Sequence, residues 1–351
     1  MMKKILLCIS LLSSSFISAQ TFSGPESVEY DAVNSRWLVG QSSSHKVLIY
    51  NPANGGLSEL CTGMSVGPYG IEILGSVLYC CDGGRVKGYD LTSGALVFNV
   101  NLSATFLNGI TSDGGSNLFV TDYSAKKIYR LNVLTSMFNV MTTTIKSPNG
   151  IIYDGDANRC VFATWGSNAP VQAMSLSDST ISTLITTTLS NCDGIIRDLQ
   201  NNWYLSAWGS GSLNKTDSAF SYMPTPVMTG LSSPADLGIS SAGDSIGIPN
   251  SGAANNVVFY AIPNSTGINE ADQRQLNLFP NPASNKVSIT IDEPVTDGII
   301  ELINSSGKII ATDKANGMLF FIDRSEFPSG NYFVRISSSS TRTITKKIIF
   351  N

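Results

Sequence analysis

The sequence predicts an all-β protein in which a six-bladed β-propeller is followed by a small Ig-like β-sandwich. Three observations lead to this prediction: a motif that recurs about every 40 residues, strands and turns that alternate between its copies, and a change of pattern after residue 262. The six repeat positions lie 39 to 44 residues apart and are Ser27, Gly70, Gly109, Gly150, Gly194 and Asp236. A period of about 40 residues built from strands and turns is typical of propeller blades.

The first 19 residues have the pattern of a secretory signal peptide. Lys3 and Lys4 precede an apolar run over residues 5–17, which is followed by the small residues Ser18 and Ala19. A charged start, an apolar core and a small residue at the cleavage site define such peptides. We therefore expect export, with cleavage after Ala19. We expect no transmembrane segment, because no later stretch approaches the roughly 18 apolar residues that a spanning helix needs.

Residues 20–262 are predicted to form the six blades. The four clearest repeats place a glycine before an isoleucine, in Gly67-Pro68-Tyr69-Gly70-Ile71, Leu107-Asn108-Gly109-Ile110, Pro148-Asn149-Gly150-Ile151 and Cys192-Asp193-Gly194-Ile195. Each repeat continues with a polar turn, a short apolar strand, a second turn and another strand, as expected of a blade.

The sixth repeat lacks an outer strand before the polar stretch at residues 263–275, which we interpret as a linker. A propeller ring has to close, and an unpaired strand edge promotes aggregation. We therefore expect Thr21 and Phe22 to supply the missing edge strand of the sixth blade.

Residues 276–351 lack the 40-residue period. Turns rich in serine, glycine, asparagine and proline separate five strand-like segments, at residues 287–291, 299–303, 319–322, 332–336 and 343–350. Several short strands within about 75 residues predict a small β-sandwich of the Ig-like kind.

Short motifs in this C-terminal segment resemble a known sorting signal. They are Leu278-Phe279-Pro280-Asn281-Pro282-Ala283, Ser306-Gly307-Lys308, Pro328-Ser329-Gly330-Asn331-Tyr332-Phe333 and Lys346-Lys347-Ile348-Ile349-Phe350-Asn351. In this order they resemble the type A C-terminal sorting domain of the type IX secretion system. The resemblance implies recognition of residues 276–351 by that machinery and passage through the periplasm. The product would then be secreted or attached to the outer-membrane surface.

Composition excludes some classes of partner. Charged residues make up 14% of the chain, and the formal net charge is −4 at pH 7. Because contacts to phosphates require clustered lysine and arginine, we expect no nucleic-acid partner. An acidic propeller is compatible with a cation or a neutral sugar. Five cysteines follow the signal peptide, an odd number, and we interpret them as small buried apolar residues.

Blade geometry predicts where a ligand would bind. In a four-stranded blade, the loop that leads into the first strand and the loop that leaves the second strand share one face, which we call the funnel face. The residues that lead into first strands on this face include Glu26, Tyr69, Asn108, Asn149 and Asp193. The loops after second strands contribute the aromatic residues Tyr123, Trp165 and Trp208.

Glu26, Asn149 and Asp193 form the sharpest candidate site. Two carboxylates and an amide oxygen that converge on the ring axis are hard ligands, suited to Ca²⁺ or another divalent metal. The alternative is that these residues only cap the starts of strands and bind nothing.

Over residues 24–262 the repeats resemble the gluconolactonase/regucalcin and NHL-repeat-like superfamily. The motifs that carry the resemblance are Pro25-Glu26-Ser27, Pro148-Asn149-Gly150 and Cys192-Asp193-Gly194. The resemblance implies that Glu26, Asn149 and Asp193 hold a metal that polarises a lactone or ester carbonyl, with Asp193 as the base for water. It also implies that Asn108 is a further polar contact.

A second hypothesis is a binding module rather than an enzyme. Trp165 and Trp208 occupy matching positions in adjacent blades, each followed by glycine and serine. Exposed indole rings beside small residues form flat platforms on which glycans stack, unless both rings pack between blades. The sequence therefore predicts an exported propeller that binds a ligand or partner at its funnel face, with a metal-dependent lactonase or esterase as the alternative.

The acidic turn Asp154-Gly155-Asp156-Ala157-Asn158 resembles the start of a calcium-binding loop. Its counterparts Asp31, Asp113 and Asp198 mark the same turn in other blades. We therefore interpret these aspartates as turn-forming residues rather than metal ligands.

Overall fold

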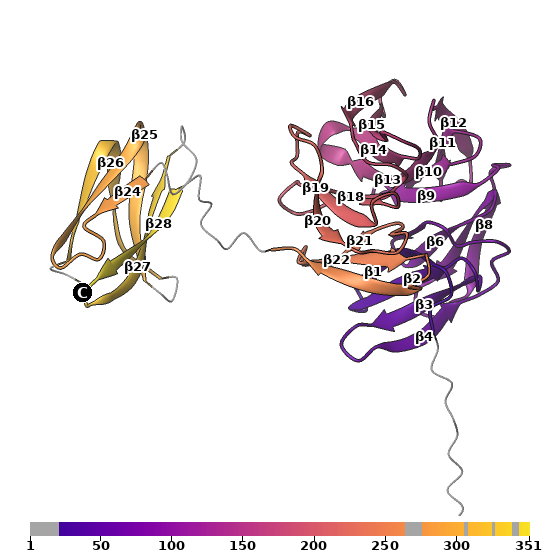
Figure 1. The fold of residues 1–351 in the computed structure, drawn as a ribbon, viewed down its shortest axis with the longest axis horizontal. Helices are drawn as coiled ribbons and strands as arrows, with labels where there is room; N and C mark the ends of the chain where they lie inside the picture. Colours follow the sequence, from indigo (N-terminus) through magenta and orange to yellow (C-terminus); the bar gives the residue numbers. More distant parts are fainter. Residues whose placement is uncertain (1–20, 264–275, 305–307, 325–326, 339–343) are drawn as a thin grey trace, which may run out of the picture. The chain divides into compact units, whose positions relative to one another are not determined.

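The computed structural model describes residues 21–263, 276–304, 308–324, 327–338 and 344–351 (Figure 1). The chain divides into two compact units, with the boundary between Ile262 and Pro263. Within the described residues the regular structure is almost entirely β-strand, with one short 3₁₀ turn, η1, at Gly155–Ala157. None of the described helical segments has the length and apolarity needed to cross a membrane. The predicted signal peptide and residues 264–275 of the predicted linker lie outside the described residues.

Six antiparallel sheets of consecutive strands make up the first unit. The first sheet contains β1 (Pro25–Asp31), β2 (Arg36–Gln41), β3 (Lys46–Asn51) and β4 (Gly56–Cys61). The second contains β5 (Ile71–Leu74), β6 (Val77–Asp82), β7 (Arg85–Asp90) and β8 (Leu96–Asn101). The third contains β9 (Leu107–Ser112), β10 (Asn117–Asp122), β11 (Lys127–Asn132) and β12 (Phe138–Thr143).

The last three sheets follow the same order along the chain. The fourth contains β13 (Pro148–Asp154), β14 (Arg159–Thr164), β15 (Pro170–Ser175) and β16 (Ile181–Thr186). The fifth contains β17 (Cys192–Arg197), β18 (Trp203–Ala207), β19 (Ser212–Thr216) and β20 (Thr225–Thr229). The sixth has three strands, β21 (Gly238–Ile239), β22 (Ser245–Asn250) and β23 (Asn256–Ala261). These sheets are the expected blades, and the predicted all-β class is confirmed.

The innermost strands of neighbouring blades pack backbone against backbone around a ring. A Cβ on Gly150 of β13 would lie 2.6 Å from the carbonyl oxygen of Asp193 on β17. The ring closes in the same way, because a Cβ on Gly238 of β21 would lie 2.3 Å from the carbonyl oxygen of Val28 on β1. In Figure 1 the orange strand β22 of the last blade accordingly lies beside β1. The recurring glycines therefore mark points where two backbones approach too closely for a side chain.

The predicted edge strand at Thr21 and Phe22 is wrong, since these two residues form no strand and the sixth sheet keeps three strands. The carbonyl of Phe22 instead accepts a hydrogen bond from Asn255 Nδ2 at 2.6 Å, and Gly24 N donates to Asn255 Oδ1 at 2.8 Å. These residues therefore contact the turn before β23, the outermost strand of the sixth sheet, through the side chain of Asn255 and without strand pairing.

Apolar layers fill the space between adjacent blades. Between the first two blades, Leu38, Cys61, Leu78 and Cys80 pack in one cluster. All five cysteines of the described residues are buried and none forms a disulfide. They therefore act as small apolar core residues, as interpreted from the sequence.

The described residues of the second unit form five strands around one apolar core. They are β24 (Leu276–Phe279), β25 (Lys286–Asn304), β26 (Ile309–Asp323), β27 (Gly330–Ser337) and β28 (Ile344–Phe350). The two predicted strands at 287–291 and 299–303 are parts of the single long strand β25, whose register with β26 breaks between Thr290 and Gly298. One end of β25 pairs with β24 and the other end with β27, which lets one sheet enclose the core. The Ig-like topology stays a prediction.

Candidate functional site

The inner strands carry the candidate residues at breaks in their pairing. In the fourth blade the register passes from Pro148↔Thr164 to Ile151↔Phe162, so β13 has one residue more than β14 at this point. The fifth blade has the same irregularity between Cys192 and Ile195. Such bulges change the direction of side chains at the end of a strand. The third blade has the same irregularity between Leu107 and Ile110. At these bulges the three successive blades bury a polar side chain. The residues are Asn108, Asn149 and Asp193, which are 6%, 1% and 3% exposed.

Two carboxylate clamps hold the loops that lead into inner strands of the second and third blades. Asp82, at the end of β6, accepts hydrogen bonds from the backbone N–H groups of Ser65, Val66 and Gly67 and pairs with Lys87 at 2.7 Å. The neighbouring blade repeats this arrangement. Asp122, at the end of β10, accepts from Thr105 N at 2.7 Å and Phe106 N at 3.1 Å.

These clamps give the loops of the funnel face a fixed shape without any ligand. In the sixth blade an amide takes the same position, since Asn250 Oδ1 accepts from Ser232 N at 3.0 Å. The residues that precede β5 and β9 are therefore positioned by buried hydrogen bonds, whose loss would leave backbone N–H groups unpaired.

Three carboxyl groups at the ring centre, Glu26, Asp193 and Asp236, influence one another; we call them the inner carboxylates. Burial raises the pKa of Asp193 well above its usual range, and the charges of Glu26 and Asp236 raise it further. Burial likewise raises the pKa of Glu26, although a hydrogen bond from Ser251 Oγ at 2.5 Å partly opposes this. Burial raises the pKa of Asp236 to about 7. In the described part of the chain, no ion pair neutralises any of the three.

Two polar atoms beside Asp193 lack a hydrogen-bond partner. The amide of Asn149 donates through Nδ2 to the carbonyl of Cys192 at 3.4 Å, but its Oδ1 atom is buried and unpaired in the described structure. The indole N–H of Trp208 lowers the pKa of Asp193 and thus lies near it, but completes no hydrogen bond of good geometry. Buried polar atoms without partners are rare and mark sites where a ligand, an ion or water belongs.

Five aromatic rings form a continuous row across the funnel face, which we call the aromatic arc. The arc runs from Tyr69 to Phe106 (ring centroids 4.5 Å apart), Tyr123 (5.8 Å), Trp165 (6.0 Å) and Trp208 (5.2 Å). Each contact is edge-to-face, the arrangement that aromatic quadrupoles favour.

All five rings of the arc are half-buried, and they come from four successive blades. Acidic groups lie near one end of the arc and near its middle, because Glu26 raises the pKa of Tyr69 and Asp193 raises that of Tyr123, in each case in addition to burial.

The structure thus brings most of the predicted site residues into one region. Asp193 lies near Glu26, Asn149 and Trp208, and Tyr69, Tyr123, Trp165 and Trp208 belong to the arc. Asn108 is buried, and no contact in the described structure joins it to this group. Sequence reasoning missed Phe106, which links Tyr69 to Tyr123. The position of Phe106 in the repeat could have identified it, because it stands in the loop before Asn108, which leads into an inner strand. The metal-binding and catalytic roles of these residues stay predictions.

A second group of acids, which the sequence analysis also missed, lines a small cavity further along the axis. The cavity has a volume of about 210 Å³, and Glu29, Glu72, Thr111, Arg197 and Asp236 are among its lining residues. Glu72 accepts hydrogen bonds from Ser112 N at 3.1 Å and Ser112 Oγ at 2.6 Å, yet burial raises its pKa to about 7. Glu29 and Glu72 share one repeat position, two residues after Ser27 and Gly70, which is the signal that could have identified them.

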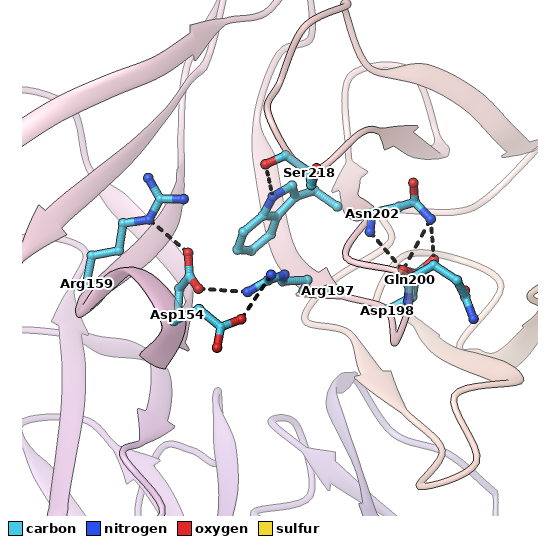
Figure 2. A network of polar contacts seen from close by, with 9 residues as sticks. Asp154, Arg159, Arg197, Asp198, Gln200, Asn202 and Ser218 are labelled. Atoms are coloured by element: carbon cyan, nitrogen blue, oxygen red, sulfur yellow. Dashed lines mark hydrogen bonds and ion pairs between the residues drawn. The ribbon is translucent and has the colours of Figure 1, made fainter. Parts of the chain in front are cut away.

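The aspartates that mimic a calcium loop have structural partners (Figure 2). Asp154 pairs with Arg159 at 2.8 Å and with Arg197 at 2.7 Å, and Asp156 pairs with Arg197 at 3.3 Å. In the next blade Asp198 accepts hydrogen bonds from the N–H groups of Gln200 and Asn202. The described residues contain no group of three or more His, Cys, Asp or Glu side chains arranged to hold a metal. These partners support the interpretation of the aspartates as turn-forming residues.

Comparison with known families identifies the C-terminal unit. Residues 277–351 match the family described as a secretion system C-terminal sorting domain, which confirms the sorting domain predicted at this end of the chain. Such a domain indicates sorting by the type IX secretion system and a secreted or cell-surface location. No curated protein matches the sequence at a significant level.

Solved structures resemble the propeller in fold. A structural genomics protein of unknown function from Bacteroides thetaiotaomicron has a TM-score of 0.57 at 14% identity, over 70% of this chain and 70% of that chain. Hydrazine synthase from Kuenenia stuttgartiensis has a TM-score of 0.52 at 13% identity, over 71% of this chain and 99% of that chain. Virginiamycin B lyase from Staphylococcus aureus has a TM-score of 0.51 at 14% identity, over 77% of this chain and 92% of that chain. At these identities the similarity shows a β-propeller-like fold alone.

Proposed function

We propose that the chain is an exported propeller that binds a small ligand at its funnel face. The observation that carries this proposal is the aromatic arc, which joins four successive blades on one face. Aromatic rings that serve only as core are buried between sheets, as Trp203 and Phe162 are in this propeller. The arc instead leaves Trp165 and Trp208 partly exposed, an arrangement that suits stacking on a flat or ring-shaped ligand.

Replacement of a ring in the arc tests this proposal. We expect Trp165→Ala to weaken binding of soluble ligands, identified first on a glycan and small-molecule panel, by about tenfold or more, with little change in the melting midpoint. Tyr222→Ala is the matched control, because Tyr222 is an exposed aromatic residue before β20, on the side of its blade opposite to the arc. Equal binding by the Trp165→Ala variant and the unmodified chain would exclude the arc as the binding surface.

A second candidate function is a metal-dependent lactonase or esterase. The unpaired Oδ1 atom of Asn149 lies next to Asp193, whose pKa the charge of Glu26 raises, and oxygen donors of this kind are those that Ca²⁺ and similar ions prefer. When bound, such a metal would polarise the carbonyl of a lactone or ester. Burial raises the pKa of Asp193, which makes its carboxylate a stronger base for water.

Thermal melting tests the metal site. Binding to the folded state raises the melting midpoint by mass action. We expect Ca²⁺, Mg²⁺, Mn²⁺ or Zn²⁺ to raise the midpoint of the chelator-treated full chain, and Asp193→Ala to abolish the shift. The exposed Asp178 provides the control Asp178→Ala, which should keep the shift. No shift with any of these ions would remove the metal site and the lactonase with it.

A further inference from the structure

We propose that the ligand of the funnel face carries a positively charged amine, held between the aromatic arc and the inner carboxylates. The inference rests on the proposed function, because it specifies the chemistry of a ligand at that same site. Three independent features lead to it. The polar atoms that lack a full set of hydrogen bonds are mostly acceptors, the inner carboxylates have no ion-pair partner among the described residues, and the aromatic arc lies near these carboxylates.

The polar atoms at the site that lack a full set of hydrogen bonds are mostly acceptors. Asn149 Oδ1 is unpaired, and its residue is only 1% exposed, so it cannot turn to bulk water. The carboxylate of Glu26 receives one side-chain hydrogen bond, from Ser251 Oγ. The unpaired donor at this place, Trp208 Nε1, lies near Asp193. Unpaired acceptor oxygens favour a positively charged group beside them and disfavour an anion.

The inner carboxylates also lack a counter-charge. Within the described residues none of the three forms an ion pair. Lys146 lies at the rim of the arc, but its Nζ atom donates to the carbonyl of Ser167 at 2.6 Å. A bound cation would supply the missing charge, whereas a neutral sugar would leave several buried acids uncompensated.

The aromatic arc is a suitable surface for an organic cation. Ammonium and quaternary ammonium groups are attracted to the faces of Trp and Tyr by the ring quadrupole, most strongly where water is excluded. The ring centroids of Trp165 and Trp208 are 5.2 Å apart, and Trp208 lies near Asp193. A cation on these rings would therefore lie close to the carboxyl group of Asp193. At the other end of the arc Tyr69 lies near Glu26. Rings and carboxylates therefore act on the same ligand group.

Calorimetric titration of the purified full chain tests the inference with a pair of isosteric probes. Choline carries the charge, and 3,3-dimethyl-1-butanol has the same shape without it; D-glucose and cellobiose serve as neutral sugars. We expect choline to bind at least about tenfold more tightly than the uncharged isostere, the order of effect of one desolvated cation–π contact. Glu26→Gln and Trp165→Ala should each weaken choline binding about tenfold, whereas the exposed Asp178→Asn should not change it.

The outcomes separate this inference from the proposed function. Equal binding of choline and its isostere, or binding of the sugars alone, would overturn the charged ligand while leaving a funnel-face binding site in place. Binding of Ca²⁺ that depends on Asp193, without any binding of choline, would overturn it in favour of the metal site. If none of the probes or ions binds, both proposals fail. Trp165→Phe, which keeps a ring, guards against misfolding: it should retain part of the affinity that Trp165→Ala loses.

Discussion

At the scale of single residues, uncompensated burial of carboxyl groups dominates the chemistry of the propeller centre. Glu72 is held by two hydrogen bonds from Ser112, and Glu29 and Asp236 share its cavity. Burial is the main cause of the raised pKa of each of the three. Arg197, which also lines this cavity, is engaged by Asp154 and Asp156. The central acids therefore favour protons, or a cation, at near-neutral pH.

This environment predicts how stability depends on pH. The pKa of Glu72 and that of Asp236 are each about 7 in the folded chain, against roughly 4 when unfolded. Between these values the folded state binds more protons than the unfolded state. The contribution of these groups is therefore fully present below about pH 4 and is lost as the pH rises through about 7. We expect the melting midpoint to fall between pH 5 and pH 8.

The variant Glu72→Gln isolates one of these groups. Gln keeps an acceptor for Ser112 but cannot ionise, so we expect it to stabilise the chain by about 3 kcal/mol at pH 8 and by only about 1 kcal/mol at pH 5. Glu59→Gln, at an exposed pair with Lys46, should change stability by less than about 0.5 kcal/mol at both pH values. Urea unfolding at the two pH values measures the difference. A Glu72→Gln variant that is no more stable at pH 8 would contradict the pH dependence assigned to this carboxyl.

At the scale of elements, several blades share one hydrogen-bonding arrangement, although the residues that form it differ. The strand before the funnel face ends in a side-chain acceptor that holds the loop leading into the inner strand. This acceptor is Asp82 in the second blade, Asp122 in the third and Asn250 in the sixth. This arrangement explains why acidic residues on the funnel face divide into two kinds. Those at the ends of second strands hold backbone N–H groups, whereas Glu26 and Asp193 hold none among the described residues.

Across the whole molecule, ring closure depends on backbone contact between the last and first blades. The backbone N–H of Asp236 donates to the carbonyl of Glu26 at 3.0 Å, and Gly238 lies against Val28. No strand from the N-terminus joins the sixth sheet in the described structure. The packing of β21 and β22 against β1 therefore takes the role that a shared strand would have had.

Gly238→Ala tests this closure. Its Cβ would lie 2.3 Å from the carbonyl oxygen of Val28, so the two blades must separate, and we expect a loss of about 3 kcal/mol or more in urea unfolding. Gly247→Ala, in the same blade, meets only side-chain atoms of Val28 and Trp37 at 3.1–3.2 Å and should cost less than about 1.5 kcal/mol. Similar losses for the two variants would show that closure does not rest on this contact.

The sequence by itself determined the period of the repeat, the all-β class, the identity of the sorting domain and the loops that carry the site. These features depend on residues close together in the chain, such as the Asn-Gly-Ile segments near the starts of β9 and β13. The tertiary structure decided that Phe106 completes the aromatic arc, that Thr21 and Phe22 form no strand, and that β25 is continuous. It also showed that Glu72 and Asp236 share a cavity. Each of these outcomes depends on distances between residues in different repeats or on burial, and local patterns contain neither.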